Sequence, residues 1–274
     1  MSTGRPWVFT LTILSLFTNT CIGGSALPFY KHQSKVLVLG SGGLIGSALV
    51  EELHSQGYST IEVLNRRHVD LRNQSQFLDF VSREDPEEAI GFVFFLACEV
   101  GGSKFLTSKS TSTQLSIIES NIQMYQTLFP WLSSRRIPFI FTSSSLQSQE
   151  SGYGTIKRLG EQWIRASGFG KSVRLWNVYG KEKFGPRSRV ITDWIISCLV
   201  KGHISSLTDG IERRQFLYTE DCAKALVILM EQYPHVPEIS DISSYQWTDM
   251  KALGNLIVSY SPAPCTIDFS DSKV

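Results

Sequence analysis

The sequence predicts an α/β protein built on a doubly wound parallel sheet. Short runs of apolar, often β-branched residues alternate with segments of helical periodicity along residues 35–176. The 274 residues are 42% hydrophobic and 19% charged, which is typical of a globular chain and not of a disordered one. A net charge of +1 gives no reason to expect a nucleic acid as a partner.

The expected elements alternate in chain order. Strands are expected over 35–39, 60–64, 90–96, 138–141 and 172–176, and helices over 44–56, 74–83, 113–133 and 153–166. Sheets of this kind bind their ligands at the carboxyl ends of the strands. The motifs described below all fall at such ends.

The N-terminus has the pattern of a secretory signal. Arg5 precedes an uncharged apolar run over 7–17, and small residues follow up to Ala26. The run is shorter than the roughly 20 residues that a membrane span needs. We therefore expect residues 1–26 to be a signal peptide, or else an uncleaved anchor. Either would place the protein in the secretory pathway (ER or Golgi lumen). A leader strand or a misread start would leave it in the cytoplasm.

The five cysteines, at positions 21, 98, 198, 222 and 265, are scattered, odd in number and without C-x-x-C spacing. This distribution predicts neither a zinc site nor a disulfide framework, and no metal site is expected. Cys98 lies near the expected chemistry, but a small buried residue is the simpler interpretation.

A glycine turn follows the first expected strand at once. Gly40, Gly43 and Gly46 are spaced G-x-x-G-x-x-G between a strand and a helix. The first permits a tight turn, the second lets the backbone approach phosphate, and the third lets helix and strand pack closely. Together with Leu44 and Ile45 at the helix N-terminus, this Rossmann-type turn is expected to bind the pyrophosphate of a dinucleotide.

The residues after the second strand indicate which dinucleotide is bound. An NAD enzyme usually carries an acid about 20 residues past the glycine turn, for the ribose 2′-hydroxyl. This chain has Asn65, Arg66 and Arg67 there. Guanidinium groups suit a 2′-phosphate, so NADP is the expected cofactor and NAD is possible. Alternatively, one or both arginines are solvated loop charges. Asp70 and Leu71 are placed to meet the adenine.

Tyr153 and Lys157 lie one turn apart on one helix face, downstream of a serine cluster at a strand end. This set resembles the short-chain dehydrogenase/reductase superfamily. The resemblance implies that Lys157 lowers the pKa of the Tyr153 phenol, so that the phenolate takes or returns a hydroxyl proton. It assigns the positioning hydroxyl to Ser144, with Ser143 and Ser145 as near alternatives. The nicotinamide would carry the hydride.

Three further segments resemble the extended, nucleotide-sugar-modifying branch, the NAD-dependent epimerase/dehydratase family. Residues 174–180 (RLWNVYG) resemble its R-x-x-N-V-Y-G segment, and residues 214–221 (RQFLYTED) resemble R-D-F-I-H-V-D-D. Residues 95–102 (FLACEVGG) look like the L-A-A-x-V-G-G stretch of GDP-fucose synthases. The resemblance covers roughly residues 35–255, and Asn121 matches the asparagine of the family's long fourth helix.

The resemblance implies a substrate site as well. Asn177 and Arg214 would meet the diphosphate of a nucleotide sugar, since a forked guanidinium matches phosphate geometry. Alternatively, Arg214 is a structural residue paired with Glu220 or Asp221. The other positions carried over are Leu96 and Ala97 for the cofactor, and Val100, Gly101 and Ser145 for the substrate.

The chain departs from the family pattern in three places. Tyr153 follows Ser144 by only nine positions, so the intervening loop, which normally touches the sugar, is short. No acid follows Ser144, so 4,6-dehydration and decarboxylation lack their usual group. The sequence ends at Val274, about 50 residues beyond Asp221, which predicts an abbreviated lobe or an incomplete C-terminus.

These observations favour an NAD(P)-dependent nucleotide-sugar epimerase or epimerase/reductase. A reductase of a small carbonyl compound and a non-catalytic cofactor-binding protein are the alternatives. We expect a dinucleotide-binding domain over 34–180 and a small substrate-binding lobe over 181–274. By analogy with relatives, a homodimer is expected, paired through the helices that hold Asn121 and Tyr153.

Overall fold

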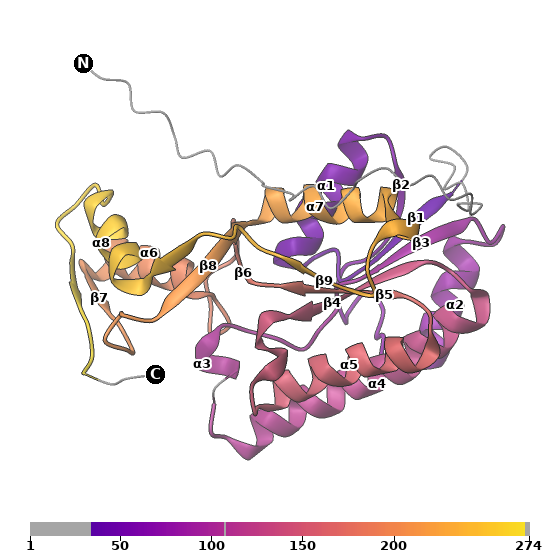
Figure 1. The fold of residues 1–274 in the computed structure, drawn as a ribbon, viewed down its shortest axis with the longest axis horizontal. Coiled ribbons are helices and arrows are strands. Elements are labelled where there is room, and N and C mark those ends of the chain that lie inside the picture. Colours follow the sequence, from indigo (N-terminus) through magenta and orange to yellow (C-terminus); the bar gives the residue numbers. More distant parts are fainter. Residues whose placement is uncertain (1–33, 107, 272–274) are drawn as a thin grey trace.

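A six-stranded parallel sheet forms the centre of the computed structural model, which describes residues 34–106 and 108–271 (Figure 1). The strand order is β2-β1-β3-β4-β5-β9, so the chain reverses direction across the sheet after β2. This is the doubly wound arrangement that the sequence predicted, and the expected fold class is confirmed. The predicted signal or anchor at 1–26 lies outside the described residues, as does Cys21.

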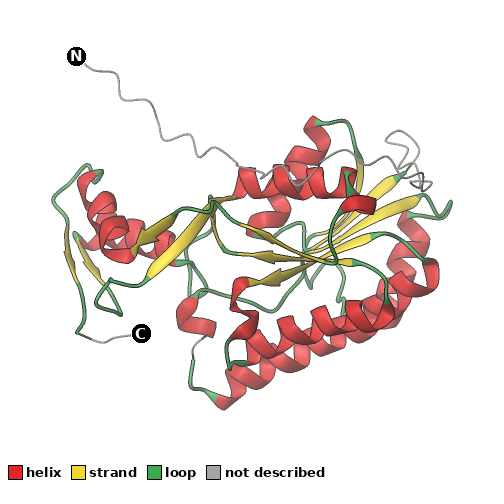
Figure 2. Ribbon diagram, viewed as in Figure 1, coloured by secondary structure: helices red, strands yellow, loops and turns green. Residues whose placement is uncertain are grey.

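Helices cover both faces of this sheet (Figures 1 and 2). The strands are β1 Lys35–Leu39, β2 Ser59–Val63, β3 Ile90–Phe95, β4 Phe139–Ser144, β5 Lys171–Leu175 and β9 Ile239–Ile242. One face carries α1 Leu44–Ser55 and α7 Thr219–Glu231. The other carries α2 Gln74–Glu84, α4 Thr111–Arg135 and α5 Gly152–Ser167. The main shift from the expected elements is at β4, which runs on to Ser144 because its last residues stay paired with β5.

The apolar strands alternate between two cores, one on each face of the sheet. In β1, Leu37 and Leu39 belong to the cluster shared with α2, α4 and α5, whereas Val36 and Val38 belong to the cluster shared with α1 and α7. All four side chains are fully buried. A strand that is covered on both faces needs apolar residues at every position, which is why β1 reads as a continuous apolar run.

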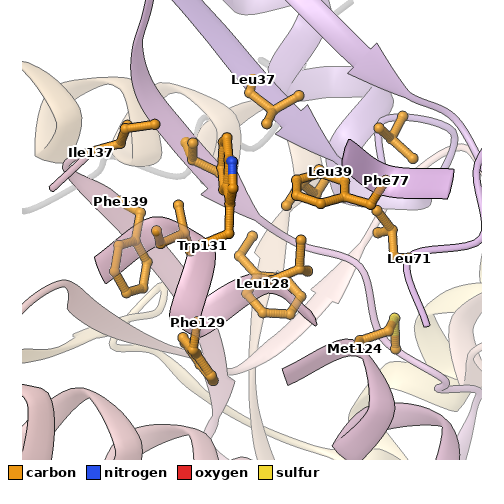
Figure 3. Close-up of a cluster of buried hydrophobic side chains, with 14 of the residues drawn as sticks. Leu37, Leu39, Leu71, Phe77, Met124, Leu128, Phe129, Trp131, Ile137 and Phe139 are labelled. Carbon is orange, nitrogen blue, oxygen red and sulfur yellow. The ribbon is translucent and has the colours of Figure 1, made fainter. Parts of the chain in front are cut away.

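The core beneath α2 and α4 is rich in aromatic rings (Figure 3). Phe77 meets Trp131 edge to face, with ring centroids 5.0 Å apart. Phe129 stacks on Trp163 at 5.2 Å. Large rings bury much apolar surface per residue, so these contacts hold α2, α4 and α5 together over the sheet.

A small lobe lies beyond the carboxyl ends of the strands (Figure 1). Its first sheet joins β6 Asn177–Tyr179, β8 Arg213–Tyr218 and β10 Trp247–Asp249, and a second pairs β7 His203–Ser205 with β11 Thr266–Asp268. The helices α6 Val190–Lys201 and α8 Met250–Ser259 pack on these strands around a separate core. The short elements α3 Ser103–Leu106, η1 Ser145–Ser148 and η2 Tyr233–His235 complete the described chain.

The chain after residue 180 does not lie wholly in this lobe. Helix α7 buries Leu226 and Val227 in the core of the central sheet, and β9 extends that sheet beside β5. The expected division at residue 180 therefore separates α7 and β9 from the sheet that they complete. Within the described residues, no helix combines the length and the apolarity needed to cross a membrane.

A disulfide joins Cys198 at the end of α6 to Cys265 just before β11. The sequence predicted no disulfide framework from its scattered cysteines, and it did not anticipate this single bond. The two residues are 67 positions apart and carry no local spacing motif. Only the folding of the lobe brings them together. Cys98 and Cys222 are free thiols.

Removing the disulfide should destabilise the protein. A cross-link over a loop of this length stabilises a folded chain by about 2–4 kcal/mol, mainly by restricting the unfolded state. We expect the Cys198→Ala/Cys265→Ala variant to lose a comparable free energy of unfolding in urea titrations. Dithiothreitol should destabilise the wild type alone. Equal sensitivity of both proteins to the reductant would contradict the assignment.

Candidate active site

A cavity of about 840 Å³ opens at the carboxyl ends of the central strands, facing the lobe. Its wall is made by the loops after β1, β2 and β3, the end of β4, the first turns of α5, strand β6 and the start of α6. Its size is in the range of small-molecule and cofactor sites. None of the described residues in the wall is a histidine.

Most of the site residues expected from the sequence meet in this one cavity. The wall includes the glycine-turn residues Gly40, Gly43, Leu44, Ile45 and Gly46, and the β2-end residues Asn65, Arg66, Arg67, Asp70 and Leu71. It also includes Leu96, Ala97, Val100, Gly101, Ser144, Tyr153, Lys157 and Asn177. Two expected residues, Ser145 and Arg214, are not part of it.

The glycine turn leaves no room for a side chain at its first and last glycines, Gly40 and Gly46. Gly40 has φ of +92°, and a Cβ there would lie 2.9 Å from the backbone nitrogen of Ala97. A Cβ on Gly46 would lie 2.2 Å from the carbonyl oxygen of Gly40. Helix α1 begins after Gly43 with no side chain capping its first turn. The first residues of the helix, Leu44, Ile45 and Gly46, line the cavity, and an uncapped helix N-terminus at this place fits a dinucleotide pyrophosphate.

Two of the three arginines after β2, Arg66 and Arg72, form ion pairs with carboxylates. Arg66 donates through Nη2 to Oε2 of Glu99 at 2.7 Å. Arg72 forms an ion pair with Asp70, with Nη2 and Oδ2 2.6 Å apart, and this hydrogen bond lowers the pKa of the Asp70 carboxyl. Arg67 is exposed at the cavity rim.

The Tyr153 phenol, the Ser144 hydroxyl and the Lys157 ammonium lie together between β4 and α5. Ser144 and Tyr153 both line the cavity, and the Ser144 hydroxyl is close enough to act on the pKa of the phenol. Lys157 Nζ donates to the Thr142 carbonyl at 2.6 Å and lies 5.5 Å from the centroid of the Tyr153 ring. The helical spacing places both residues of α5 on the face that meets the end of β4.

Burial governs the protonation of the phenol. It raises the pKa of Tyr153 above its ordinary value, while the Lys157 ammonium and the Ser144 hydroxyl act to lower it. The lysine therefore works in the expected direction but does not outweigh burial. Burial also acts to lower the pKa of Lys157, but Cys98 and Tyr153 hold it above its ordinary value. Lys157 thus remains an ammonium.

The structure separates the roles of the neighbouring serines. Ser143 donates its hydroxyl to Glu161 Oε1 at 2.6 Å, away from Tyr153. Glu161 is also held by Arg174 through Nε at 2.8 Å and Nη2 at 2.7 Å. Ser144 is thus the serine that acts on the phenol, while Ser143, which also lines the cavity, donates its hydroxyl to the buried network of Glu161 and Arg174.

Cys98 also lines the cavity, at the end of β3. Its thiol lies 3.7 Å from the Glu99 carbonyl, and it is near enough to Lys157 for each to act on the pKa of the other. Burial raises the pKa of this thiol, against the influence of Lys157. A thiol held protonated in this way does not serve as a base at neutral pH, because the thiolate is the basic form.

The wall nearest the lobe contains residues that the sequence analysis missed. Arg187 and Arg189 precede α6 and line the cavity with Tyr179 and Phe216. Arg187 Nη1 lies 2.6 Å from Glu99 Oε1, and Arg189 Nη1 lies 2.6 Å from Glu182 Oε2. The basic run over 181–189, directly after the N-V-Y-G segment, was the signal that could have identified them.

Three residues with expected roles lie elsewhere. Arg214 lies partly exposed on β8, two residues before Phe216, and no ion pair joins it to Glu220 or Asp221 among the described residues. Ser145 begins the short helix η1, outside the cavity wall. Asn121 is fully buried and hydrogen-bonds the backbone of Glu99, which is a structural role. Contact of Arg214 or Ser145 with a substrate stays a prediction.

The fold and this cavity define a class of protein: a Rossmann-type protein with the serine, tyrosine and lysine of the short-chain dehydrogenase/reductase superfamily. Comparison with known families narrows the class. The model of the NAD-dependent epimerase/dehydratase family matches residues 36–242. The chain belongs to this family.

The curated relatives act on nucleotide sugars, by their names. GDP-L-fucose synthase 1 of Arabidopsis thaliana is 22% identical over 271 residues, covering 86% of this chain and 80% of its own. ADP-L-glycero-D-manno-heptose-6-epimerase of Alkalilimnicola ehrlichii is 23% identical, covering 82% of this chain and 80% of its own.

Solved structures share the fold. GDP-mannoheptose C4 reductase of Campylobacter jejuni, with NADP bound, superposes with a TM-score of 0.70 at 18% identity, covering 88% of each chain. UDP-glucose 4-epimerase of Thermotoga maritima, with UDP-glucose, gives a TM-score of 0.69 at 20% identity, covering 86% of this chain and 85% of that one.

The ionic network under the site should make stability depend on pH. Burial acts to raise the pKa of Glu161, but the hydrogen bonds from Arg174 and Ser143 outweigh it and lower that pKa. Ionised Glu161 therefore stabilises the fold fully above pH of about 4.5, the ordinary value, and this contribution is lost as the pH falls through the lowered pKa.

We expect Glu161→Gln to lower the free energy of unfolding at neutral pH by about 1–3 kcal/mol and to flatten its decline in acid. Urea titrations across acid pH measure both quantities. Glu238→Gln, which breaks an exposed pair with Arg165, is the control and should leave the profile unchanged. Parallel curves for Glu161→Gln and the wild type would contradict the assignment.

Proposed function

We propose that the chain is an NADP-dependent nucleotide-sugar epimerase or epimerase/reductase. The observation that carries this proposal is the meeting, in one cavity, of the glycine turn with Ser144, Tyr153 and Lys157. The turn is shaped for a pyrophosphate, and the three side chains can move a proton at a sugar hydroxyl or ketone. The names of the curated relatives support the same class of substrate.

The cofactor proposal rests on the residues after β2. Arg66 and Arg67 line the cavity where a carboxylate would be expected for NAD. Their guanidinium groups suit the 2′-phosphate of NADP, the cofactor that the Campylobacter reductase holds in its crystal structure. NAD remains the alternative cofactor.

The chemistry assigned to this chain's own residues is proton transfer and orientation. When bound, the nicotinamide supplies or accepts a hydride. The Tyr153 oxygen gives its proton to a ketone oxygen, or takes one from a hydroxyl, and Ser144 holds the same substrate oxygen in place. The Lys157 ammonium stabilises the phenolate that forms when Tyr153 has given up its proton.

The substrate end of the cavity supports an anionic ligand. Asn177 and Tyr179 come from β6, and Arg187 and Arg189 come from the loop before α6. Guanidinium groups are the usual partners of a diphosphate. Arg214 lies two residues before Phe216 and so on the same side of β8, and we assign it to the outer part of the substrate site.

A reductase without epimerase activity is the second candidate, and a specific observation favours it. Inversion at a carbon beside the ketone needs a base and an acid in addition to Tyr153. The described cavity wall has no histidine, its carboxylates Asp70 and Glu99 are both paired with arginines, and the thiol of Cys98 has a raised pKa.

A panel experiment separates these functions. The purified protein is incubated with UDP-, GDP-, ADP- and dTDP-sugars, and with GDP-4-keto-6-deoxymannose, each with NADP⁺ or NADPH. An epimerised product supports the first proposal, and a reduced product without inversion supports the second. Turnover of simple ketones alone would favour a reductase of small carbonyl compounds. Binding without turnover would indicate a non-catalytic protein.

The catalytic assignment makes a sharper prediction on whichever substrate turns over. Tyr153→Phe should abolish turnover while leaving NADPH binding within a few-fold, because only the ionisable oxygen is removed. Ser144→Ala should lower kcat by about 10²-fold or more. Ser143→Ala is the matched control and should lower the melting temperature with little effect on kcat. Wild-type activity in Tyr153→Phe would refute the assignment.

We also propose that the protein enters the secretory pathway. The apolar run before Ala26 supports this, and the Cys198–Cys265 disulfide adds to it, because disulfides persist in oxidising compartments. N-terminal sequencing of protein produced in a eukaryotic host is expected to begin near Leu27. An intact Met1 on cytosolic protein would rule out the signal.

A homodimer formed through α4 and α5 is proposed as the assembly. These helices lie side by side on the outer face of the molecule (Figure 1), and Leu115 and Leu159 are exposed there. Sedimentation velocity should give twice the mass of one chain for the wild type, and a monomer for Leu115→Glu/Leu159→Glu. A wild-type monomer at micromolar concentration would exclude this assembly.

A further inference from the structure

Glu99 binds two arginines that come from different walls of the cavity. Oε2 accepts a hydrogen bond from Arg66, which follows β2, at 2.7 Å. Oε1 lies 2.6 Å from Nη1 of Arg187, which belongs to the loop before α6. One carboxylate therefore links the residues placed for the adenosine end of a dinucleotide to the wall nearest the lobe. We call Arg66, Glu99 and Arg187 the arginine clasp.

The carboxylate is the fixed member of the clasp. The Glu99 N–H donates to Asn121 Oδ1 at 3.1 Å, and the Glu99 carbonyl accepts from Asn121 Nδ2 at 3.3 Å. Asn121 is fully buried in α4, and the Glu99 side chain is only 9% exposed. Both arginine side chains are about half exposed, at 51% and 55%. Any exchange of partners therefore involves the arginines moving and not Glu99.

Arg187 is held more firmly than Arg66. Its carbonyl accepts a hydrogen bond from the Gly102 N–H at 2.9 Å, and its guanidinium lies 4.5 Å from the centroid of the Phe105 ring. Both contacts tie Arg187 to the segment that follows Glu99. No other hydrogen bond of the Arg66 side chain is found among the described residues. Arg66 can therefore leave Glu99 at a lower cost in free energy than Arg187 can.

The clasp has an electrostatic asymmetry. If Arg66 leaves, Glu99 keeps the charge of Arg187 beside it, so no buried carboxylate is stranded without a partner. If Arg187 is removed, Arg66 is the one arginine of the clasp that still pairs with Glu99, and Arg72, itself paired with Asp70, adds only its nearby charge. The presence of Arg187 therefore determines how easily Arg66 is released.

We propose that Glu99 competes with the 2′-phosphate of NADP for Arg66, and so sets how strongly the protein prefers NADP over NAD. The inference rests on the proposed use of NADP. A phosphate monoester has a higher charge than a carboxylate and three acceptor oxygens, so it can draw Arg66 from Glu99 at the cost of that ion pair. NAD carries no such group and leaves the clasp intact. Glu99 thus moderates NADP affinity, and Arg187 limits that effect.

The competition predicts effects of opposite sign. Glu99→Gln removes the competing charge and should tighten NADPH binding by about 10-fold, the scale of one charged hydrogen bond. Arg187→Met keeps the length of the side chain but leaves Glu99 dependent on Arg66, and should weaken NADPH binding by about 5- to 10-fold. NADH binding should stay within two-fold in both variants. Both effects should disappear in an Arg66→Ala background.

Isothermal titration of the full chain with NADPH and with NADH measures these affinities without any substrate. Glu182→Gln breaks the neighbouring carboxylate–arginine pair with Arg189 and serves as the control, with an unchanged ratio of the two affinities. Thermal melts show whether each variant is folded. If either Glu99→Gln or Arg187→Met fails to fold, the other still tests the proposal, because the two are expected to change NADPH affinity in opposite directions.

Weaker NADPH binding by Glu99→Gln, or equal changes for both cofactors, would overturn the competition while leaving the dinucleotide site in place. Persistence of the effects without Arg66 would overturn it too. A wild-type protein that binds neither NADPH nor NADH would instead refute the proposed function, on which the inference rests.

Discussion

The buried ammonium of Lys157 is the contact on which the arrangement of the site depends. This side chain is 2% exposed, yet it carries a charge, and its hydrogen bond to the Thr142 carbonyl helps to replace the water that it has lost. A charge in this position stays buried only while α5 remains docked against the end of β4. The same docking brings Tyr153 close to Ser144. The need to keep the Lys157 ammonium buried therefore also fixes the positions of these two side chains. Glu161 and Arg174 reinforce it from beneath through Ser143.

Much of this could be predicted from the sequence, because the signals are local. Continuous apolar runs such as that of β1 reflect burial on both faces. The spacing of Tyr153 and Lys157 follows from the helical repeat alone. The glycine turn lies between a strand and a helix, as a dinucleotide site requires. The strand ends then converge at one edge of a parallel sheet, which is why most of the expected residues share one cavity.

What the sequence did not reveal depends on contacts between distant segments. Cys198 and Cys265 pair because the lobe brings α6 to β11. Glu99 lies within the 95–102 stretch, which was matched to the family by its neighbouring residues and not by this carboxylate. The two arginines that pair with it lie 33 residues before it and 88 after it, and no spacing rule links positions so far apart. Arg214 matched a motif, but the position of the cavity wall beside β8 is a tertiary property. Which serine meets Tyr153 required the position of Glu161.

The path of the chain between the central sheet and the lobe has a mechanical consequence. The chain enters the lobe at β6, returns through β8 to α7, and enters it again from β9 to β10. Several parallel connections resist twisting and swinging far better than a single linker does. Ligands therefore reach the cavity through its mouth, without a wide opening of the lobe. A protease cutting the lobe between Cys198 and Cys265 would therefore leave the two pieces joined by their disulfide.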